Sequence, residues 1–112
     1  MTAPALTPFS ALLAARRRDG DQVAFAIPPD WLQGRTSFGG LIAALAVQAM
    51  RDVAGSALPL PPLRALQTAF VGPVGEGRMD VRVQLLRAGK STCQVQATVT
   101  QQQGDAPQVA AV

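Results

Sequence analysis

A pair of glycines at the start of a long apolar run is the feature of this sequence best suited to chemistry. Gly39 and Gly40 precede a run that is almost wholly apolar as far as residue 54. If the run is helical, the free N–H groups of Gly39, Gly40 and Leu41 converge where negative charge develops on a carbonyl oxygen under attack. Glycine also lets a ligand approach the backbone without meeting a Cβ. The alternative explanation is structural, namely that the pair lets the helix enter close against a sheet.

Side chains that could activate a water molecule are scarce. The 112 residues contain no histidine, which removes the commonest general base and metal ligand. Gln48 can orient a water but takes no proton, and it is also explained as a helix side chain at an interface. Thr68 is a second candidate for orienting a water, with an ordinary strand threonine as the alternative. Asp52 is expected at the surface, and Cys93, which lacks a histidine partner, is expected in the core rather than as a nucleophile.

The charged residues limit the classes of partner. The net charge of +3 comes almost entirely from arginines, of which Arg16, Arg17 and Arg18 form a cluster without interleaved aromatic residues. We interpret this cluster as the solvated end of a short helix, with nucleic-acid binding as the alternative. The basic cluster follows the N-terminal apolar run, the reverse of a secretory signal, so we expect a cytoplasmic protein. With one cysteine and no histidine, we expect neither a metal site nor a cofactor.

The glycine pair would be positioned by a long central helix. Apolar residues recur at helical spacing on nearly all sides of this segment, which predicts a buried helix over residues 40–54. Thr36 or Ser37 is expected to cap its start and Gly55 to close it. The helix is about 24 Å long, and its uncharged part is too short to be read as a membrane span.

Strands are expected to bury this helix. A short helix over residues 10–18 comes first, and Trp31 is expected to act as a lid or wall for the core. A proline-rich linker follows the central helix, because Pro59, Pro61 and Pro62 exclude both helix and central strand. The alternation of apolar and polar residues predicts five strands, over residues 22–27, 63–71, 79–85, 92–100 and 108–112. The expected architecture is therefore α+β, with one long helix wrapped by a five-stranded antiparallel sheet.

Three segments extend this outline to a known family. The run SFGGLIAALAVQA resembles the helix start of the TesB-like, double-hotdog acyl-CoA thioesterases. The family's Phe-x-x-Pro strand end is matched by Phe70 to Pro73, and its Leu-Arg-x-Gly-Lys/Arg-Ser hairpin by Leu86 to Ser91. Its strand closing on a Gln-rich turn is matched by Thr100 to Gly104. The resemblance covers about Trp31 to the end and implies a hotdog fold.

The resemblance is to the first of the family's two hotdog halves. It implies that residues 1–112 form a single hotdog domain, either the N-terminal half of a longer double-hotdog protein or one unit of a homodimer. The family looks as though it carries its catalytic Asp, Thr and Gln on the second half. The corresponding positions here fall at Val47, near Leu63, and at or past Val112, and none of the three matches. No catalytic side chain is therefore transferred.

The resemblance implies an acyl-CoA thioesterase-like protein that hydrolyses or binds acyl-CoA thioesters. Phe38 and Leu41 are then expected to contact the substrate, whose acyl chain would lie between the helix and a neighbouring unit's sheet. Arg82, Arg87 and Lys90 are candidates for binding the phosphates of coenzyme A, with a solvated hairpin tip as the alternative. The alternative function is a non-catalytic hotdog half that serves dimerisation or acyl binding, which the missing histidine favours. No nucleic acid is expected as a partner.

Overall fold

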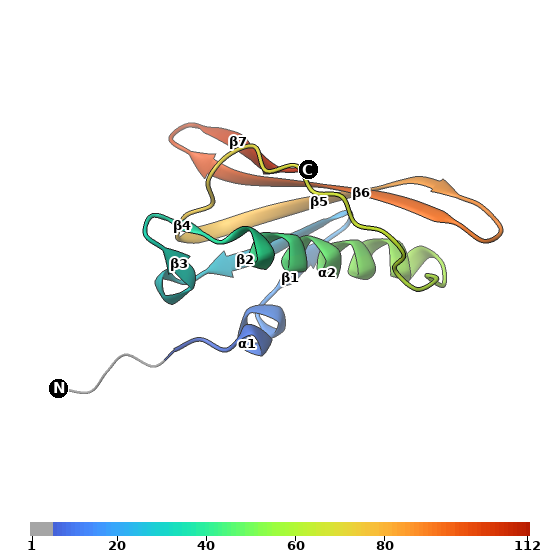
Figure 1. Cartoon of the computed structure of the whole chain (residues 1–112), viewed down its shortest axis with the longest axis horizontal. Helices are drawn as coiled ribbons and strands as arrows, with labels where there is room; N and C mark the ends of the chain where they lie inside the picture. The colour runs from blue at the N-terminus through green and yellow to red at the C-terminus, as the bar shows by residue number, and fades with distance from the viewer. Residues whose placement is uncertain (1–5) are drawn as a thin grey trace.

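A long helix runs along one face of an antiparallel sheet in the computed structural model, which describes residues 6–112 (Figure 1). The helix is α2 (Gly39–Ala57), and the five strands lie in the order β1-β2-β5-β6-β7. Their bounds are β1 (Arg17–Asp19), β2 (Gln22–Ile27), β5 (Gly77–Ala88), β6 (Cys93–Gln103) and β7 (Ala106–Ala111). The remaining elements are α1 (Phe9–Ala14), a 3-10 turn (Pro29–Trp31), β3 (Leu32–Gln33) and β4 (Thr36–Ser37). The predicted α+β hotdog architecture is confirmed.

The core lies between one side of α2 and the inner face of the sheet. On α2 the buried side chains recur at helical spacing, and Leu45 is wholly buried. The other side of the helix is less covered, since Ala44 is exposed and Val47 is half-buried. The helix is therefore buried on one side and not on all sides. Its buried residues are Leu41, Ile42, Leu45, Ala49 and Ala54.

The predicted signals for the two ends of α2 are both wrong. Phe38 occupies the N-cap position and supplies no side-chain hydrogen bond. Thr36 and Ser37 instead form β4, and their hydroxyl groups bond to Val74. The N–H of Val74 donates to Oγ1 of Thr36 (3.2 Å), and Oγ of Ser37 donates to the carbonyl of Val74 (3.2 Å). At the other end the helix continues past Gly55 to Ala57.

The hairpin of β5 and β6 carries the inner face of the sheet as the alternation predicts. Val81 pairs with Val99 and Val83 with Ala97, and all four side chains are buried. Beyond an irregularity in register after Leu85, the hairpin projects past the end of α2 and its apolar side chains become exposed (Figure 1). Cys93, at the start of β6, is half-buried rather than a core residue.

The strand predicted over residues 63–71 is wrong. Only Phe70 forms a bridge, with Ala111, supported by the N–H groups of Ala69 and Val71 donating to the carbonyls of Val112 and Ala110 at 2.8 Å each. Residues 58–68 run past the sheet without joining it, and Leu66 is 47% exposed. Residues 63–68, which carry most of the apolar alternation, therefore have no partner strand within the described chain.

The fifth strand comes from a segment that was predicted to be helical. α1 ends at Ala14, and Arg17–Asp19 pairs with β2 across a tight turn. Gly20 has φ +63° in that turn, a conformation that favours glycine. The expected helix over residues 10–18 is therefore two elements, α1 and β1.

Candidate functional site

The N-terminus of α2 presents backbone donors that no other group of residues 6–112 uses. Because Phe38 offers no side-chain acceptor, the N–H groups of Gly39 and Gly40 have no hydrogen-bond partner there. The N–H of Leu41 donates to the carbonyl of Phe38 at 3.2 Å. Two of the three predicted donors are thus available to a ligand, at the end of the helix where the macrodipole is positive.

Two aromatic rings stand against the glycine pair. A Cβ built on Gly39 would lie 2.7 Å from Cζ of Phe70, and one built on Gly40 would lie 2.8 Å from Cε2 of Phe38. The glycines therefore make room for two phenylalanine rings. Because Phe70 bridges to Ala111 of β7, this close packing at the sheet edge fits the structural explanation as well as the functional one. Both rings are partly exposed, Phe38 at 40% and Phe70 at 58%.

The Phe38 ring stacks on the indole of Trp31. The two rings stack with centroids 6.2 Å apart and planes 19° from parallel. Nε1 of Trp31 donates to the carbonyl of Thr7 at 2.8 Å, which fixes the indole. Trp31 packs half-buried against the core, so its expected place as a wall is confirmed.

A pocket of about 400 Å³ opens beside the helix start. Its apolar walls come from α2, from the chain around Phe70 and Val74, and from β7. None of the eight residues that line it carries a carboxylate, an amine or an imidazole. Gly39 lines the pocket, whereas Gly40, the next residue, lies outside the lining. An apolar cavity bordered by a free N–H group suits a ligand with an apolar chain and a carbonyl oxygen. The lining residues are Thr36, Ser37, Gly39, Ile42, Phe70, Gly72, Val74 and Ala110.

A buried glutamine on β6 holds one wall of this pocket in place. Oε1 of Gln101 accepts from the N–H of Gly75 at 2.8 Å, and its Nε2 donates to the carbonyl of Gly75 at 3.0 Å. Gln101 is 6% exposed. Sequence reasoning did not single it out, although the alternation of β6 places it two residues beyond Val99 on the buried face. A polar residue at such a position has to be hydrogen-bonded, and that is the signal that identifies it.

The structure brings together only part of the predicted site. Phe38, Gly39 and Gly40 lie at the helix start, whereas Leu41 is 1% exposed and faces the core. Thr68 is half-buried and does not line the pocket. Gln48 lies further along α2, where its Nε2 donates to Oδ1 of Asp52 at 2.9 Å.

The three predicted phosphate ligands lie away from the glycine pair. Arg82 is exposed between the buried residues of β5, on the outer face of the sheet. Arg87 and Lys90 lie at the projecting tip of the β5–β6 hairpin, past the C-terminal end of α2 (Figure 1). There they line a second pocket, of about 320 Å³, with Gly89, Ser91, Thr92 and Gln94.

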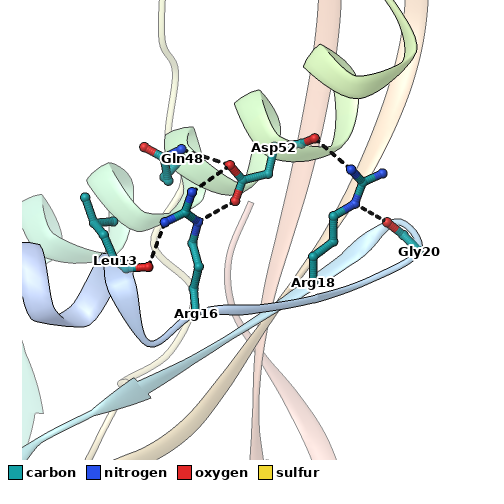
Figure 2. Close-up of polar contacts among 6 residues, drawn as sticks. All are labelled: Leu13, Arg16, Arg18, Gly20, Gln48 and Asp52. Atoms are coloured by element: carbon teal, nitrogen blue, oxygen red, sulfur yellow. Dashed lines mark hydrogen bonds and ion pairs between the residues drawn. The ribbon is translucent and has the colours of Figure 1, made fainter.

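Asp52 is not the plain surface residue that was expected, because two arginines converge on it (Figure 2). Nε of Arg16 lies 2.6 Å from Oδ2, and Nη1 of Arg18 donates to the Asp52 carbonyl at 3.0 Å. Nη1 of Arg16 also donates to the carbonyl of Leu13 at 2.6 Å. Arg16 and Arg18 are therefore not a solvated helix end; they tie α1 and β1 to α2.

The contacts of Asp52 decide its protonation. Partial burial raises the pKa of Asp52, but the hydrogen bonds from Arg16 and Gln48 and the charges of Arg16 and Arg18 outweigh it, and the pKa lies below its ordinary value. The hydrogen bond to Asp52 in turn raises the pKa of Arg16. A carboxylate held in this way is a poor proton acceptor at neutral pH.

Residues 6–112 contain neither a cluster of metal ligands nor a helix suited to cross a membrane. No group of three or more His, Cys, Asp or Glu side chains is arranged to hold a metal ion. In the same residues, no helix has the length and apolar character that a bilayer crossing requires.

Comparison with known proteins gives both a family and a fold. Residues 27–112 match the family described as acyl-CoA thioesterase N-terminal domain. A candidate thioesterase II from Thermobifida fusca superposes with a TM-score of 0.73 at 18% identity, over 95% of this chain and 37% of that one. A candidate thioesterase from Ralstonia eutropha JMP134, described as related to phenylacetic acid degradation, superposes with a TM-score of 0.75 at 19% identity. That comparison covers 96% of this chain and 86% of the other. At these identities the likeness to solved structures shows the fold alone. No curated protein matches the chain in sequence.

Proposed function

Because the chain belongs to the acyl-CoA thioesterase N-terminal domain family, we propose that it binds acyl-CoA thioesters with the acyl carbonyl at the start of α2. The observation that carries this proposal is that the N–H groups of Gly39 and Gly40 make no hydrogen bond within the described chain and lie beside an apolar pocket. A thioester needs a donor for its oxygen and an apolar space for its acyl chain, and this site offers both.

In the proposed reaction the two N–H groups stabilise the oxyanion that forms when water attacks the thioester carbon. A preformed donor of this kind is worth about a hundredfold to a thousandfold in kcat. The acyl chain lies against Ile42 and Val74, with Phe38 and Phe70 on either side of the carbonyl. Thr36 and Ser37 already share hydrogen bonds with Val74, so they are not free to activate water.

The group that takes the proton from water comes, in this proposal, from a second hotdog unit. The pocket lining holds no carboxylate or imidazole, and Asp52 is engaged by Arg16. Gln48 and Thr68 lie outside the pocket lining, so orienting a water at the carbonyl would need a rearrangement. A second copy of this chain or a second hotdog domain would complete the site.

Arg82, Arg87 and Lys90 are proposed to bind phosphates of a coenzyme A whose thioester lies on a neighbouring unit. Their distance along the sheet from Gly39 supports this division between units. Replacing Arg87 and Lys90 by glutamine is expected to raise KM for an acyl-CoA and to leave KM for the matching acyl-pantetheine unchanged, because only the former carries the phosphates. An equal rise for both substrates would contradict the assignment.

The alternative function is a non-catalytic hotdog half that binds acyl groups or serves dimerisation. The observation that favours it is the pocket lining, which lacks any side chain able to accept a proton. We also propose the cytoplasm as the site of action.

Turnover and binding separate the two functions. The purified chain is incubated with acyl-CoAs from acetyl-CoA to palmitoyl-CoA, and release of free thiol is followed. Binding of a non-hydrolysable acyl-CoA thioether is measured by calorimetry on the same preparation. Release of thiol supports the thioesterase, saturable binding without release supports the non-catalytic half, and absence of both would overturn the proposal for this site.

A further inference from the structure

The ring of Phe70 stands where a carbonyl must approach the helix start. Its Cζ, Cε1 and Cε2 atoms lie 2.7, 3.1 and 3.2 Å from the position that a Cβ on Gly39 would take. Helical Cα–Cβ bonds tilt toward the N-terminus, which is also the direction in which the first-turn N–H groups point. A ligand that reaches the N–H of Gly39 therefore shares its space with the outer edge of this ring.

The backbone that carries Phe70 is held firmly. Ala69 and Val112 exchange two hydrogen bonds, of 2.8 and 3.0 Å, and the N–H of Val71 donates to the carbonyl of Ala110 at 2.8 Å. Gly72 adds a further bond to the same carbonyl, at 3.1 Å. The position of Phe70 along the edge of the sheet is thus fixed on both sides of the residue.

The side chain itself is much less constrained than this backbone. The residue is 58% exposed, and the ring makes its close contact at Gly39 through its far end. Exposed side chains change rotamer in picoseconds to nanoseconds. Any opening of the space above Gly39 therefore comes from rotation of the ring and needs no movement of the chain.

We propose that Phe70 is the specificity-determining residue of the site, and that its ring restricts the acyl group at the carbons next to the carbonyl. The ring fills the space above Gly39, so an acyl group enters only when the ring turns aside. A methyl branch beside the carbonyl needs a larger displacement of the ring than an unbranched acyl group does. The preferred substrates are thus acyl thioesters that are unbranched at the α-carbon. The inference rests on the proposed function, since it names the substrates of the same site.

Butyryl-CoA and isobutyryl-CoA form a matched pair for the test, because they are isomers that differ only in branching beside the carbonyl. We expect the intact chain to prefer butyryl-CoA, in kcat/KM or in affinity. Phe70→Ala is expected to reduce this preference about tenfold, the size of effect that one methyl group has in a shaped pocket. Phe70→Leu is expected to act in the same direction, because leucine lacks the outer ring atoms that contact Gly39, and it serves if Phe70→Ala folds poorly.

Val71→Ala is the control for the neighbouring side chain. Val71 is on the same hydrogen-bonded backbone, is 63% exposed and does not line the pocket. The butyryl preference is expected to be unchanged in this variant. If Phe70→Ala, Val71→Ala and the unaltered chain all show the same preference for butyryl-CoA, the role of Phe70 is overturned while the proposed function is not. No binding and no turnover of either thioester by the unaltered chain would overturn the proposed function, and this inference with it.

A double-mutant cycle tests the contact itself. Gly39→Ala places a methyl group against the Phe70 ring and is expected to change the butyryl preference, but to have no such effect in the Phe70→Ala background. Gly40→Ala is the matched control, because its Cβ meets the ring of Phe38 and not that of Phe70. Its effect is expected to add to that of Phe70→Ala. Additive effects for both glycines would overturn the assigned contact.

Discussion

At the scale of single residues, the helix start can be tested through its backbone. Gly40→Pro removes one N–H group, and proline is tolerated in the first turn of a helix. Gly40→Ala adds a comparable carbon beside the ring of Phe38 but keeps the N–H. We expect Gly40→Pro to lower kcat about a hundredfold or more relative to Gly40→Ala, because one oxyanion donor is lost. Steady-state thiol release measures the difference, and equal rates in the two variants would contradict an oxyanion role for this N–H.

Gln101 is the residue whose loss should disturb the pocket wall most. Gln101→Leu leaves the half-buried N–H and carbonyl of Gly75 without their partners. We expect the free energy of unfolding to fall by about 1–2 kcal/mol, because partly buried polar groups are left unpaired. Urea denaturation measures the change. Gln102→Leu is the control, since Gln102 is exposed and bonds only the carbonyl of Gly104, and it is expected to stay within about 0.5 kcal/mol.

The sequence predicts those parts of the site whose residues are adjacent in the chain, and not those that distant segments bring together. The glycine pair and Phe38 are adjacent in sequence, and both were found from the motif alone. Phe70 and Gln101 reach the pocket from distant segments, and only the folded chain shows that they meet Gly39 and Gly75. Arg87 and Lys90 fit a phosphate by type, but their place beyond the end of α2 is set by the length of the hairpin.

At the scale of elements, the attachment of α1 and β1 to α2 gives a pH-dependent stability. The pKa of Asp52 is lowered in the folded chain, so the stabilisation is present above the unfolded value, near pH 4, and is lost as the pH falls through the folded value. Asp52→Asn is therefore expected to lower the free energy of unfolding at pH 7 by about 1 kcal/mol, because Arg16 and Asp52 are less than a third exposed. The difference from the unaltered chain is expected to shrink below about pH 4, measured by urea denaturation across pH.

The second ion pair of the described chain is the control for this prediction. Arg78 lies 2.9 Å from Asp80 but its side chain is 73% exposed. Asp80→Asn is expected to change the stability at pH 7 by less than about 0.5 kcal/mol. If Asp80→Asn lowers the free energy of unfolding as much as Asp52→Asn does, the Arg16–Asp52 pair does not stabilise the fold more than an exposed ion pair.

The elements themselves were predictable where the apolar pattern was long. The helix and the hairpin of β5 and β6 have repeated patterns of their own, and both form as expected. β1 has only three residues, all charged, so nothing in its pattern distinguishes it from the end of a helix. Residues 63–71 alternate like a strand, yet only residues 69–71 meet a partner, at the end of β7. Residues 63–68 have no pairing partner within the described chain, and a strand exists only where another chain segment pairs with it.

At the scale of the whole molecule, residues 63–71 give the chain an apolar edge. Leu63, Leu66, Phe70 and Val71 are between 47% and 63% exposed, and Val109 and Val112 on the neighbouring edge are also exposed. Residues 69–71, at the end of this segment, pair with the C-terminal end of β7, which is itself the last strand of the sheet (Figure 1). Exposed apolar side chains next to an open sheet edge favour pairing with another hotdog unit.

We therefore expect the chain to form dimers at micromolar concentration, with Leu63 and Leu66 at the interface and with Phe70 and Val71 outside it. Leu66→Asp buries a charge in that interface and is expected to weaken dimerisation about tenfold or more, measured by analytical ultracentrifugation. Leu86→Asp is the matched control, because Leu86 is equally apolar and 57% exposed but lies on the projecting hairpin. It is expected to leave the dissociation constant unchanged. A monomer in the unaltered chain, or equal weakening by the two substitutions, would contradict pairing through this edge. A monomer would also leave the site, which lacks its own proton acceptor, without a neighbouring unit to supply one.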